Sequence, residues 1–326
     1  MRHMKVFITR VISEAGLKLL RDAGIDIVEW KEKRQLSKEE LIAACQDADA
    51  LLSVGSKVDR EFLAACKHLK VIALHSVGYD HVDVPAATEL GIPIGNTPGV
   101  LSAATADTAF LLMLATSRKA FYLHKSIAKG NWGFFEPTAN LGIELRGKTL
   151  GVFGLGKIGL EMARCCKHAY GMKILYHNRS TNPDAEAELG ATWVSFDELL
   201  AQSDVLTVHT ALTPETEGVF NAAAFAKMKQ TAIFINTARG GIHDEADLTN
   251  ALEAGIIWGA GLDVTNPEPM KADNPLLNMP NVSVLPHIGS ATLETRNAMS
   301  VLAAENIIAG LKGEQLPHPV NPEVYD

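Results

Sequence analysis

Short apolar runs alternate with amphipathic stretches along most of the chain, and they form two separate series. The first series runs from Lys5 to about Gly95, and helical patterns lie between its short apolar runs. The second runs from Thr149 to about Pro286, and each run is nearly continuous in Val, Ile, Leu and Phe. Apolar runs separated by helical patterns are typical of parallel sheets that helices cover on both faces. The pattern therefore predicts an α/β fold with two parallel sheets.

The expected strands can be placed within each series. Those of the first series are 5–9, 25–30, 50–53, 71–76 and 92–96. Those of the second series are 149–154, 172–178, 205–210, 232–238, 259–264 and 282–287. Ser13 and Ser37 precede helical patterns and are expected to cap them, because a hydroxyl oxygen accepts from free N–H groups in the first turn.

Two further stretches have a helical pattern. Residues 102–130 are apolar on more than one face, so we expect a helix that is either deeply buried or covered by a second subunit. This favours a homodimer through the 102–135 region. A final helix, from about Ala291 to Lys312, follows the last strand of the second series and is expected to return to the first domain.

Composition and charge exclude several classes of protein. The net charge is −8 with no long run of Lys or Arg, which argues against a nucleic-acid partner. The longest apolar run, near residues 109–115, is too short to cross a bilayer, and no signal-peptide pattern precedes the first strand. The cysteines lack metal-ligand spacing and are interpreted as buried free thiols of a cytoplasmic protein: Cys45, Cys66, Cys165 and Cys166.

A glycine-rich turn lies between a Val/Phe run and an amphipathic helix in the middle of the chain. Gly154 permits the tight turn, Gly156 leaves room for a pyrophosphate, and Gly159 allows close packing of the helix. The helix N-terminus then offers free N–H groups to the phosphates. We therefore expect a dinucleotide to be bound by Gly154, Leu155, Gly156, Lys157 and Ile158.

The turn after the next strand indicates which dinucleotide is bound. An NAD site usually carries Asp or Glu here, whose charge repels a 2′-phosphate. This chain has Asn178, nineteen residues after Gly159, followed by Arg179 and Ser180. A neutral amide, a guanidinium and a hydroxyl suit a 2′-phosphate, so NADPH is predicted over NADH. The alternative is a solvated turn in which Arg179 points to water.

Three other strand ends carry residues suited to keto-acid chemistry. Because ligands bind beyond the carboxyl ends of parallel strands, Arg239, Glu268 and His287 are expected to converge. A guanidinium fork matches a carboxylate, an imidazole transfers a proton near neutral pH, and a carboxylate beside it favours the imidazolium. Each residue taken alone has a structural alternative: Arg239 could form a surface ion pair, Glu268 could be a loop charge, and His287 could cap a helix.

Longer motifs resemble a known family. "HSVGYDHVDV", "NTPGVLSAATADTA", "NTARGG", "GLDVTNPEP" and "PHIGSAT" occur in the order found in the D-isomer-specific 2-hydroxyacid dehydrogenases, and the similarity covers essentially the whole chain. Within the family, the chain is most similar to the glyoxylate/hydroxypyruvate and 2-ketogluconate reductases. The resemblance implies two Rossmann-like or flavodoxin-like domains with a cleft between them. It divides the chain into a substrate-binding domain (1–100), a dinucleotide-binding domain (101–290) and a returning helix (291–326).

The resemblance also implies roles for individual residues. Arg239 would bind the substrate, His287 would be the acid/base and Glu268 its partner. The main-chain N–H groups of Val77 and Gly78 would hold the substrate carboxylate, and the segment containing Trp132 would pack in a dimer. The remaining expected cofactor contacts are Thr210, Thr216, Thr237, Asp263, His287 and Gly289.

Polar residues near the substrate motif have simpler interpretations. His75 and His81 flank it but do not fit the acid/base motif, so structural roles are expected for both. Asp80 and Asp83 are expected to cap a helix or support a turn.

The function predicted on these grounds is NADPH-dependent reduction of a small 2-keto acid to the D-2-hydroxy acid, with no metal. One alternative is an NAD-linked dehydrogenase of another 2-hydroxy acid, such as phosphoglycerate. The other is a binding protein that senses a dinucleotide, as co-repressors of similar sequence do.

Overall fold

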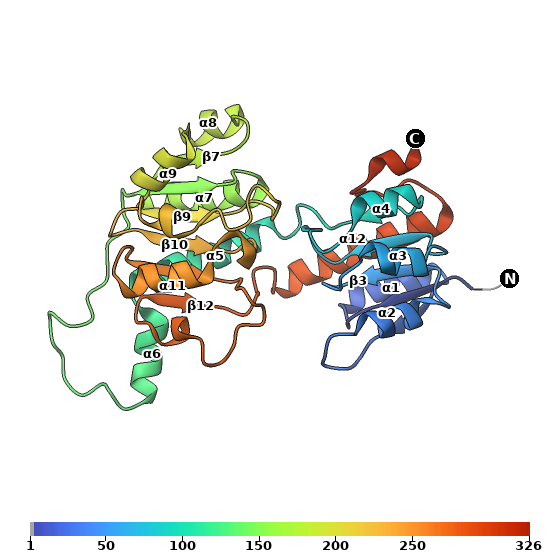
Figure 1. The fold of residues 1–326 in the computed structure, drawn as a ribbon, viewed down its shortest axis with the longest axis horizontal. Helices are drawn as coiled ribbons and strands as arrows, with labels where there is room; N and C mark the ends of the chain where they lie inside the picture. Colours follow the sequence, from blue (N-terminus) through green and yellow to red (C-terminus); the bar gives the residue numbers. More distant parts are fainter. Residues whose placement is uncertain (1–2) are drawn as a thin grey trace. The chain divides into compact units, whose positions relative to one another are not determined.

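The computed structural model describes residues 3–326, and the chain divides into two compact units (Figure 1). The first unit extends to Leu101 and resumes from Ala291 to Asp326, whereas the second contains Ser102–Ser290. Each unit has one sheet whose named strands all pair in parallel, with helices packed on it. The predicted α/β fold with two parallel sheets is confirmed.

The sheet of the first unit has five strands in the order β2-β1-β3-β4-β5, which is the flavodoxin-like order. The strands are β1 (Lys5–Ile8), β2 (Asp26–Glu29), β3 (Ala50–Ser53), β4 (Val71–Leu74) and β5 (Ile94–Gly95). The helices are α1 (Glu14–Asp22), α2 (Lys38–Cys45), α3 (Arg60–Ala65), α4 (Val84–Glu89) and α12 (Leu293–Lys312), followed by a short 3₁₀ turn, η3 (Pro322–Tyr325). Strands β3 and β4 are buried throughout, because apolar clusters cover both faces of the sheet.

Local signals account for the helix starts in this unit. The side chain of Ser13 accepts from the N–H of Ala15, and Ser37 forms a capping box with Glu40. Both predicted caps are confirmed. Asp83 likewise caps α4 by accepting from the N–H of Ala86.

Helix α12 belongs to the first unit although 189 residues of the second unit precede it. It packs against α1, β3 and β4, and the close approach depends on two glycines. A Cβ atom at Gly16 would overlap the backbone of Ser300, and one at Gly310 would overlap the side chain of Val71. The C-terminal part of the chain therefore completes the core of the N-terminal unit.

The sheet of the second unit has seven strands in the order β12-β11-β10-β9-β6-β7-β8, and the direction of winding reverses between β6 and β9. The strands are β6 (Thr149–Phe153), β7 (Lys173–His177), β8 (Thr192–Trp193), β9 (Val205–Val208), β10 (Ile233–Asn236), β11 (Gly259–Leu262) and β12 (Val282–Val284). The helices are α5 (Ser102–Ser117), α6 (Ala120–Ala128), α7 (Lys157–Tyr170), α8 (Pro183–Leu189), α9 (Phe196–Gln202), α10 (Ala222–Phe225) and α11 (Glu245–Glu253), with 3₁₀ turns η1 (Gly240–Ile242) and η2 (Pro275–Asn278). Ligands bind at such a reversal, which here lies beside the glycine-rich turn.

Residues 102–130 are helical as predicted, but they form two helices, α5 and α6, and not a single one. The helix breaks after Ser117, and Lys119 adopts a left-handed conformation with φ 56° before α6 begins. The carbonyl of Ser117 accepts from the N–H of Ile143 at 3.0 Å, so a segment further along the chain takes the place of the next helical turn. Helix α5 is buried against α7, β10 and β11, whereas α6 has no buried residue.

No helix within residues 3–326 is both long enough and apolar enough to span a membrane.

Candidate active site

His287 and Glu268 form the closest pair of titratable side chains at the carboxyl ends of β11 and β12. Nδ1 of His287 lies 2.6 Å from Oε1 of Glu268, and both side chains remain partly open to solvent. The imidazole therefore has one nitrogen fixed by a carboxylate, which orients the ring and leaves Nε2 as the atom available for proton transfer.

Asp263 holds the backbone that presents His287. Its carboxylate accepts from the N–H of Ile288 at 2.8 Å and from that of Gly289 at 2.7 Å, and its carbonyl accepts from the N–H of His287. His287 has φ 55°, a conformation uncommon for a residue other than glycine, so these bonds retain a strained backbone. Burial raises the pKa of Asp263, although the two N–H groups oppose that change.

The electrostatics at Glu268 favour the charged carboxylate. Burial acts to raise its pKa, but the hydrogen bond and charge of His287, the N–H of Thr265 and the charge of Arg239 outweigh burial and lower it. Arg239 follows β10 and Glu268 follows β11, and these two strands are parallel neighbours in the sheet. The second unit thus brings the three predicted catalytic side chains to the same end of its sheet.

The Arg239 loop is held by packing as well as by hydrogen bonds. Nδ2 of Asn236 donates to the carbonyl of Arg239 at 2.9 Å, while Oδ1 of Asn236 accepts from the N–H of Ala238 at 2.9 Å. A Cβ atom at Gly240 would overlap the carbonyl of Thr265, so only glycine lets this loop lie against the strand end that leads to Glu268.

The glycine-rich turn has the geometry expected of a phosphate loop. Gly154 has φ 98°, and a Cβ atom there would meet the backbone of His209 and Thr210. A Cβ atom at Gly156 would meet nothing within 4 Å, which leaves open space above the start of α7. No side chain caps this helix, so its first N–H groups, at Lys157 and Ile158, face that space. The cradle therefore fits a pyrophosphate.

The Asn178 side chain is already bound within the protein. Its Oδ1 accepts from the N–H of Leu155 at 2.6 Å, and its Nδ2 donates to the carbonyl of Leu155 at 3.4 Å. Arg179 and Ser180 are exposed at the same turn. Asn178 therefore holds the phosphate loop in shape, whereas Arg179 and Ser180 face outward, where a ligand can reach them.

The other expected cofactor residues lie at the ends of β9 and β10, with different roles for their hydroxyls. Oγ1 of Thr237 lies 3.5 Å from Nδ1 of His209, whose Nε2 lies 2.9 Å from Oγ1 of Thr207. Burial lowers the pKa of His209 to about 3, so this histidine is neutral at physiological pH. Thr210 follows directly and is half-buried beside the phosphate loop.

Thr216 has its hydroxyl committed to its own loop. Oγ1 accepts from the N–H of Thr213 at 2.8 Å and lies 2.8 Å from the carbonyl of Ala211, to which it donates. Its hydroxyl therefore supports the loop, and any contact with a cofactor has to share that group.

The predicted substrate residues Val77 and Gly78 lie in the first unit, after the carboxyl end of β4, and are half-buried. His75 precedes them, with Nε2 3.0 Å from Oγ of Ser300. Burial, with a smaller effect of the nearby Arg296 charge, lowers the pKa of His75 to about 4. The neutral, enclosed ring of His75 fits the structural role expected for it.

Two residues that support the phosphate loop and the turn after β7 were not identified by the sequence analysis. Nδ2 of Asn182 donates to the carbonyl of Leu155 at 3.2 Å, and Nε1 of Trp193 donates to the carbonyl of Asn178 at 3.0 Å. Asn182 precedes Pro183, which is the signal of a helix start, and it does cap α8. Its second bond joins segments 27 residues apart, and no local pattern reports that.

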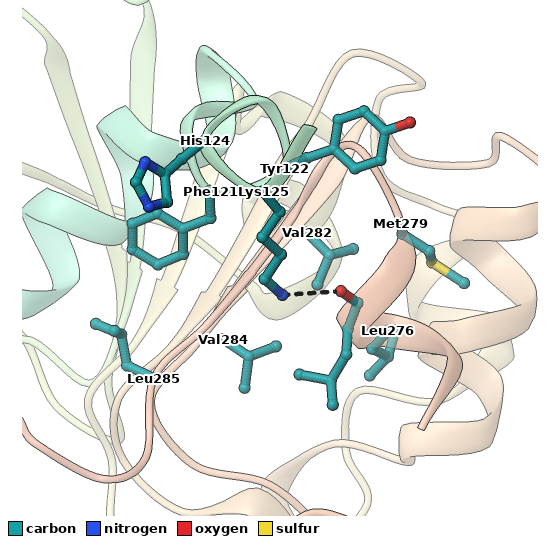
Figure 2. A pocket seen from close by; sticks show the side chains of 10 residues that line it. Phe121, Tyr122, His124, Lys125, Leu276, Met279, Val282, Val284 and Leu285 are labelled. Carbon is teal, nitrogen blue, oxygen red and sulfur yellow. Dashed lines mark hydrogen bonds between the residues drawn. The ribbon is translucent and has the colours of Figure 1, made fainter. Parts of the chain in front are cut away.

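An apolar groove of about 410 Å³ lies elsewhere on the second unit, between α6 on one side and η2 with β12 on the other (Figure 2). Its walls are mainly aromatic and aliphatic, with Lys125 crossing it to donate to the carbonyl of Leu277 at 3.2 Å. The segment that follows α6 forms a long loop (Figure 1) and carries strongly exposed aromatic side chains: Trp132, Phe134 and Phe135.

A metal site is not part of this arrangement: across residues 3–326, no three His, Cys, Asp or Glu side chains are grouped so as to hold an ion.

Comparison with known proteins gives one consistent family. Residues 110–289 match the family described as D-isomer specific 2-hydroxyacid dehydrogenase, NAD binding domain. A glyoxylate reductase of Thermococcus litoralis is 43% identical over 325 residues, which covers 98% of this chain and 97% of that protein. The Homo sapiens glyoxylate reductase/hydroxypyruvate reductase is 43% identical over 319 residues, 97% of each chain.

A solved structure agrees with these relatives. The NADPH-dependent glyoxylate/hydroxypyruvate reductase of Sinorhizobium meliloti, in complex with NADP and malonate, is similar with a TM-score of 0.86 and 34% identity. The match covers 99% of this chain and 98% of that chain.

Proposed function

Because the chain belongs to the D-isomer specific 2-hydroxyacid dehydrogenases, we propose that it reduces glyoxylate and hydroxypyruvate to their 2-hydroxy acids with NADPH. The observation that carries the proposal is the 2.6 Å contact between His287 and Glu268, with Arg239 beyond the end of the neighbouring strand β10. The names of the Thermococcus, human and Sinorhizobium relatives support the choice of keto acid. The sequence resemblance makes 2-ketogluconate a further candidate substrate. None of these three relatives is a phosphoglycerate dehydrogenase or a dinucleotide-sensing protein, so they do not support those two alternative functions.

Each of the three side chains has a defined task in this reaction. Arg239 holds the substrate carboxylate and keto oxygen through its planar fork and counters the negative charge that develops on the oxygen. His287 gives its Nε2 proton to that oxygen, and Glu268 stabilises the imidazolium beforehand and fixes its ring. A reduced nicotinamide bound at the glycine-rich turn would supply the hydride for the keto carbon. The main-chain N–H groups of Val77 and Gly78 add two donors for the carboxylate.

The cofactor proposal rests on the phosphate loop and the turn after β7. The open space at Gly156 and the uncapped start of α7 fit the pyrophosphate. Arg179 and Ser180, exposed beside this loop, supply a cation and a hydroxyl for a 2′-phosphate, and Asn178 brings no repelling charge. Thr210, Thr216, Thr237, Asp263 and Gly289 are proposed to contribute around the rest of the cofactor.

The assembly proposed is a homodimer through the 102–135 region. It would cover the apolar groove beside α6 (Figure 2). It would also cover the exposed aromatic side chains of the following loop, which a second copy carries equally. Sedimentation of the native protein at micromolar concentration should show a dimer, and replacing Phe134 and Phe135 together by Ser should shift it toward monomer. A wild-type protein that is monomeric at that concentration contradicts the proposal.

The reaction is tested by following NADPH and NADH oxidation with glyoxylate, hydroxypyruvate, 2-ketogluconate and phosphohydroxypyruvate. Glyoxylate and hydroxypyruvate should give the highest kcat/KM, and His287→Ala should lose roughly 10²–10⁴-fold in turnover while still binding NADPH. No turnover of any keto acid by the wild-type protein, or full activity of His287→Ala, would falsify the assignment.

A further inference from the structure

Three consecutive carbonyl oxygens of the substrate loop, which we define as Ser76–Tyr79, are held by the protein. The carbonyl of Ser76 accepts from the N–H of Thr97 at 3.0 Å. The carbonyl of Val77 accepts from Nδ2 of Asn96 at 2.9 Å, and the carbonyl of Gly78 accepts from Oγ of Ser76 at 2.7 Å.

These contacts determine where the loop's N–H groups point. A peptide unit is planar and trans, so the direction of each C=O fixes the direction of the following N–H. The bond to the carbonyl of Ser76 therefore orients the N–H of Val77, and the bond from Asn96 to the carbonyl of Val77 orients the N–H of Gly78. These are the two donors assigned to the substrate carboxylate.

Asn96 is itself held in place by α12 and the segment that follows it. Nδ2 of Asn306 donates to the carbonyl of Asn96 at 3.0 Å, and Oδ1 of Asn306 accepts from the N–H of His318 at 3.2 Å. The N–H of Asn96 donates to the carbonyl of His318 at 3.1 Å. Asn306 is fully buried, and its amide fills the space that a side chain at Gly95 would need.

A second buried asparagine at the same sheet edge has no such connection. Oδ1 of Asn321 accepts from the N–H of Ile94 at 2.7 Å, and its Nδ2 donates to the carbonyl of Ile92 at 3.1 Å and lies 3.0 Å from Oγ1 of Thr88. All of these bonds tie the C-terminal segment to β5 and α4. Asn321 therefore contributes to the stability of the edge without touching the substrate loop.

We infer that Asn96 is a positioning residue for the substrate carboxylate: its amide holds the Val77 carbonyl and thereby aims the Gly78 N–H, while Asn306 holds Asn96. The inference rests on the proposed function, in which the N–H groups of Val77 and Gly78 bind that carboxylate. It gives the returning part of the chain a role in substrate affinity in addition to its role in the core.

The test compares Asn96→Asp and Asn96→Ala with Asn321→Ala as the matched control. Asn96→Asp keeps the shape but replaces the amide donor by a carboxylate that faces a carbonyl. Losing one oriented hydrogen bond should raise KM for glyoxylate roughly tenfold, with kcat changed less and KM for NADPH unchanged. Asn96 is only half-buried, so the Ala variant is expected to fold if the Asp variant does not. Asn321→Ala should lower Tm and leave KM for glyoxylate unaltered.

A second measurement does not depend on turnover. Hydrogen exchange of the Thr97 and Val82 N–H groups, which donate to the carbonyls of Ser76 and Tyr79, reports opening of the loop. It should be faster in both Asn96 variants than in the wild type and in Asn321→Ala. Unchanged exchange, or an equal rise of KM in Asn321→Ala, overturns the positioning role. If hydrogen exchange is faster in the Asn96 variants as expected but the wild-type protein reduces no keto acid, the proposed function is wrong and the positioning of the loop by Asn96 stands.

Discussion

The Nδ1 atom of His287 lies 2.6 Å from Oε1 of Glu268, and the two residues come from different strand ends of one sheet. A carboxylate in this position stabilises the protonated imidazole and selects the nitrogen that faces the ligand. The pair is partly exposed, so its electrostatic effect is moderated by solvent.

Replacing Glu268 by Gln should move the alkaline limb of the pH profile for keto-acid reduction to lower pH. The proposed reaction requires the imidazolium, and Gln removes the negative charge that favours it. The measurement is kcat/KM for glyoxylate between pH 5 and 9.

Glu245→Gln provides the control, because Glu245 accepts from the N–H of Asn266 at 2.8 Å in the loop that leads to Glu268 but has no bond to His287. If the two variants shift the profile equally, the effect comes from the loop and not from the pair.

Arg239→Lys should lower kcat/KM for glyoxylate by roughly ten- to a hundredfold, because lysine keeps the charge but loses the planar fork. The affinity for NADPH, measured by fluorescence titration, should change little. Arg146→Lys is a suitable control, since its guanidinium packs on Tyr170 at 4.8 Å from the ring centre. Equal losses for keto acid and cofactor would reassign Arg239 to the cofactor.

Two substitutions at the turn after β7 should change cofactor preference. Arg179→Ala removes the proposed cation and should raise KM for NADPH roughly tenfold with little change for NADH. Asn178→Asp should shift preference toward NADH, because a carboxylate can still accept from the N–H of Leu155 while its charge repels a 2′-phosphate.

Lys173→Ala is the control for this pair, since it removes an exposed positive charge at the opposite end of the same strand. Preference measured as the ratio of kcat/KM values should stay at the wild-type value in that variant. If the wild-type enzyme already prefers NADH at subsaturating cofactor concentration, Arg179 has no role in cofactor preference and is a solvated surface residue.

His243 should make the protein less stable in acid. It is buried, its Nε2 has no partner within residues 3–326, and burial lowers its pKa to about 4, with the Asp244 charge opposing this. The unfolded chain binds a proton near pH 6.5, which the folded state resists, so stability is full above that pH and falls as pH drops toward 4. The loss attributable to His243 is at most ~3 kcal/mol.

In His243→Phe, the free energy of unfolding measured with urea should differ less between pH 7.5 and pH 5 than it does in the wild type. This holds whether or not the substitution changes stability at pH 7.5. His168→Phe, on the exposed part of α7, should leave the dependence as in the wild type. A His243 variant with an unchanged slope would show that other groups cause the acid sensitivity.

The sequence by itself determined the α/β fold, most strands, the helix caps at Ser13 and Ser37, and the family. These features depend on signals within one turn or one strand: a hydroxyl followed by free N–H groups, or an apolar run between turn residues. The convergence of Glu268 and His287 was also predictable, because the carboxyl ends of neighbouring parallel strands meet at one edge.

Only the tertiary structure decided which partner each polar group takes. The 102–130 stretch breaks because Ile143 bonds to Ser117, Asn178 turns to Leu155, and Asn96 reaches Val77. Each of these residues has a polar side-chain or backbone group for which the sequence offers several possible hydrogen-bond partners and does not specify one. The partner that is chosen depends on which distant segment the packing brings within hydrogen-bonding distance.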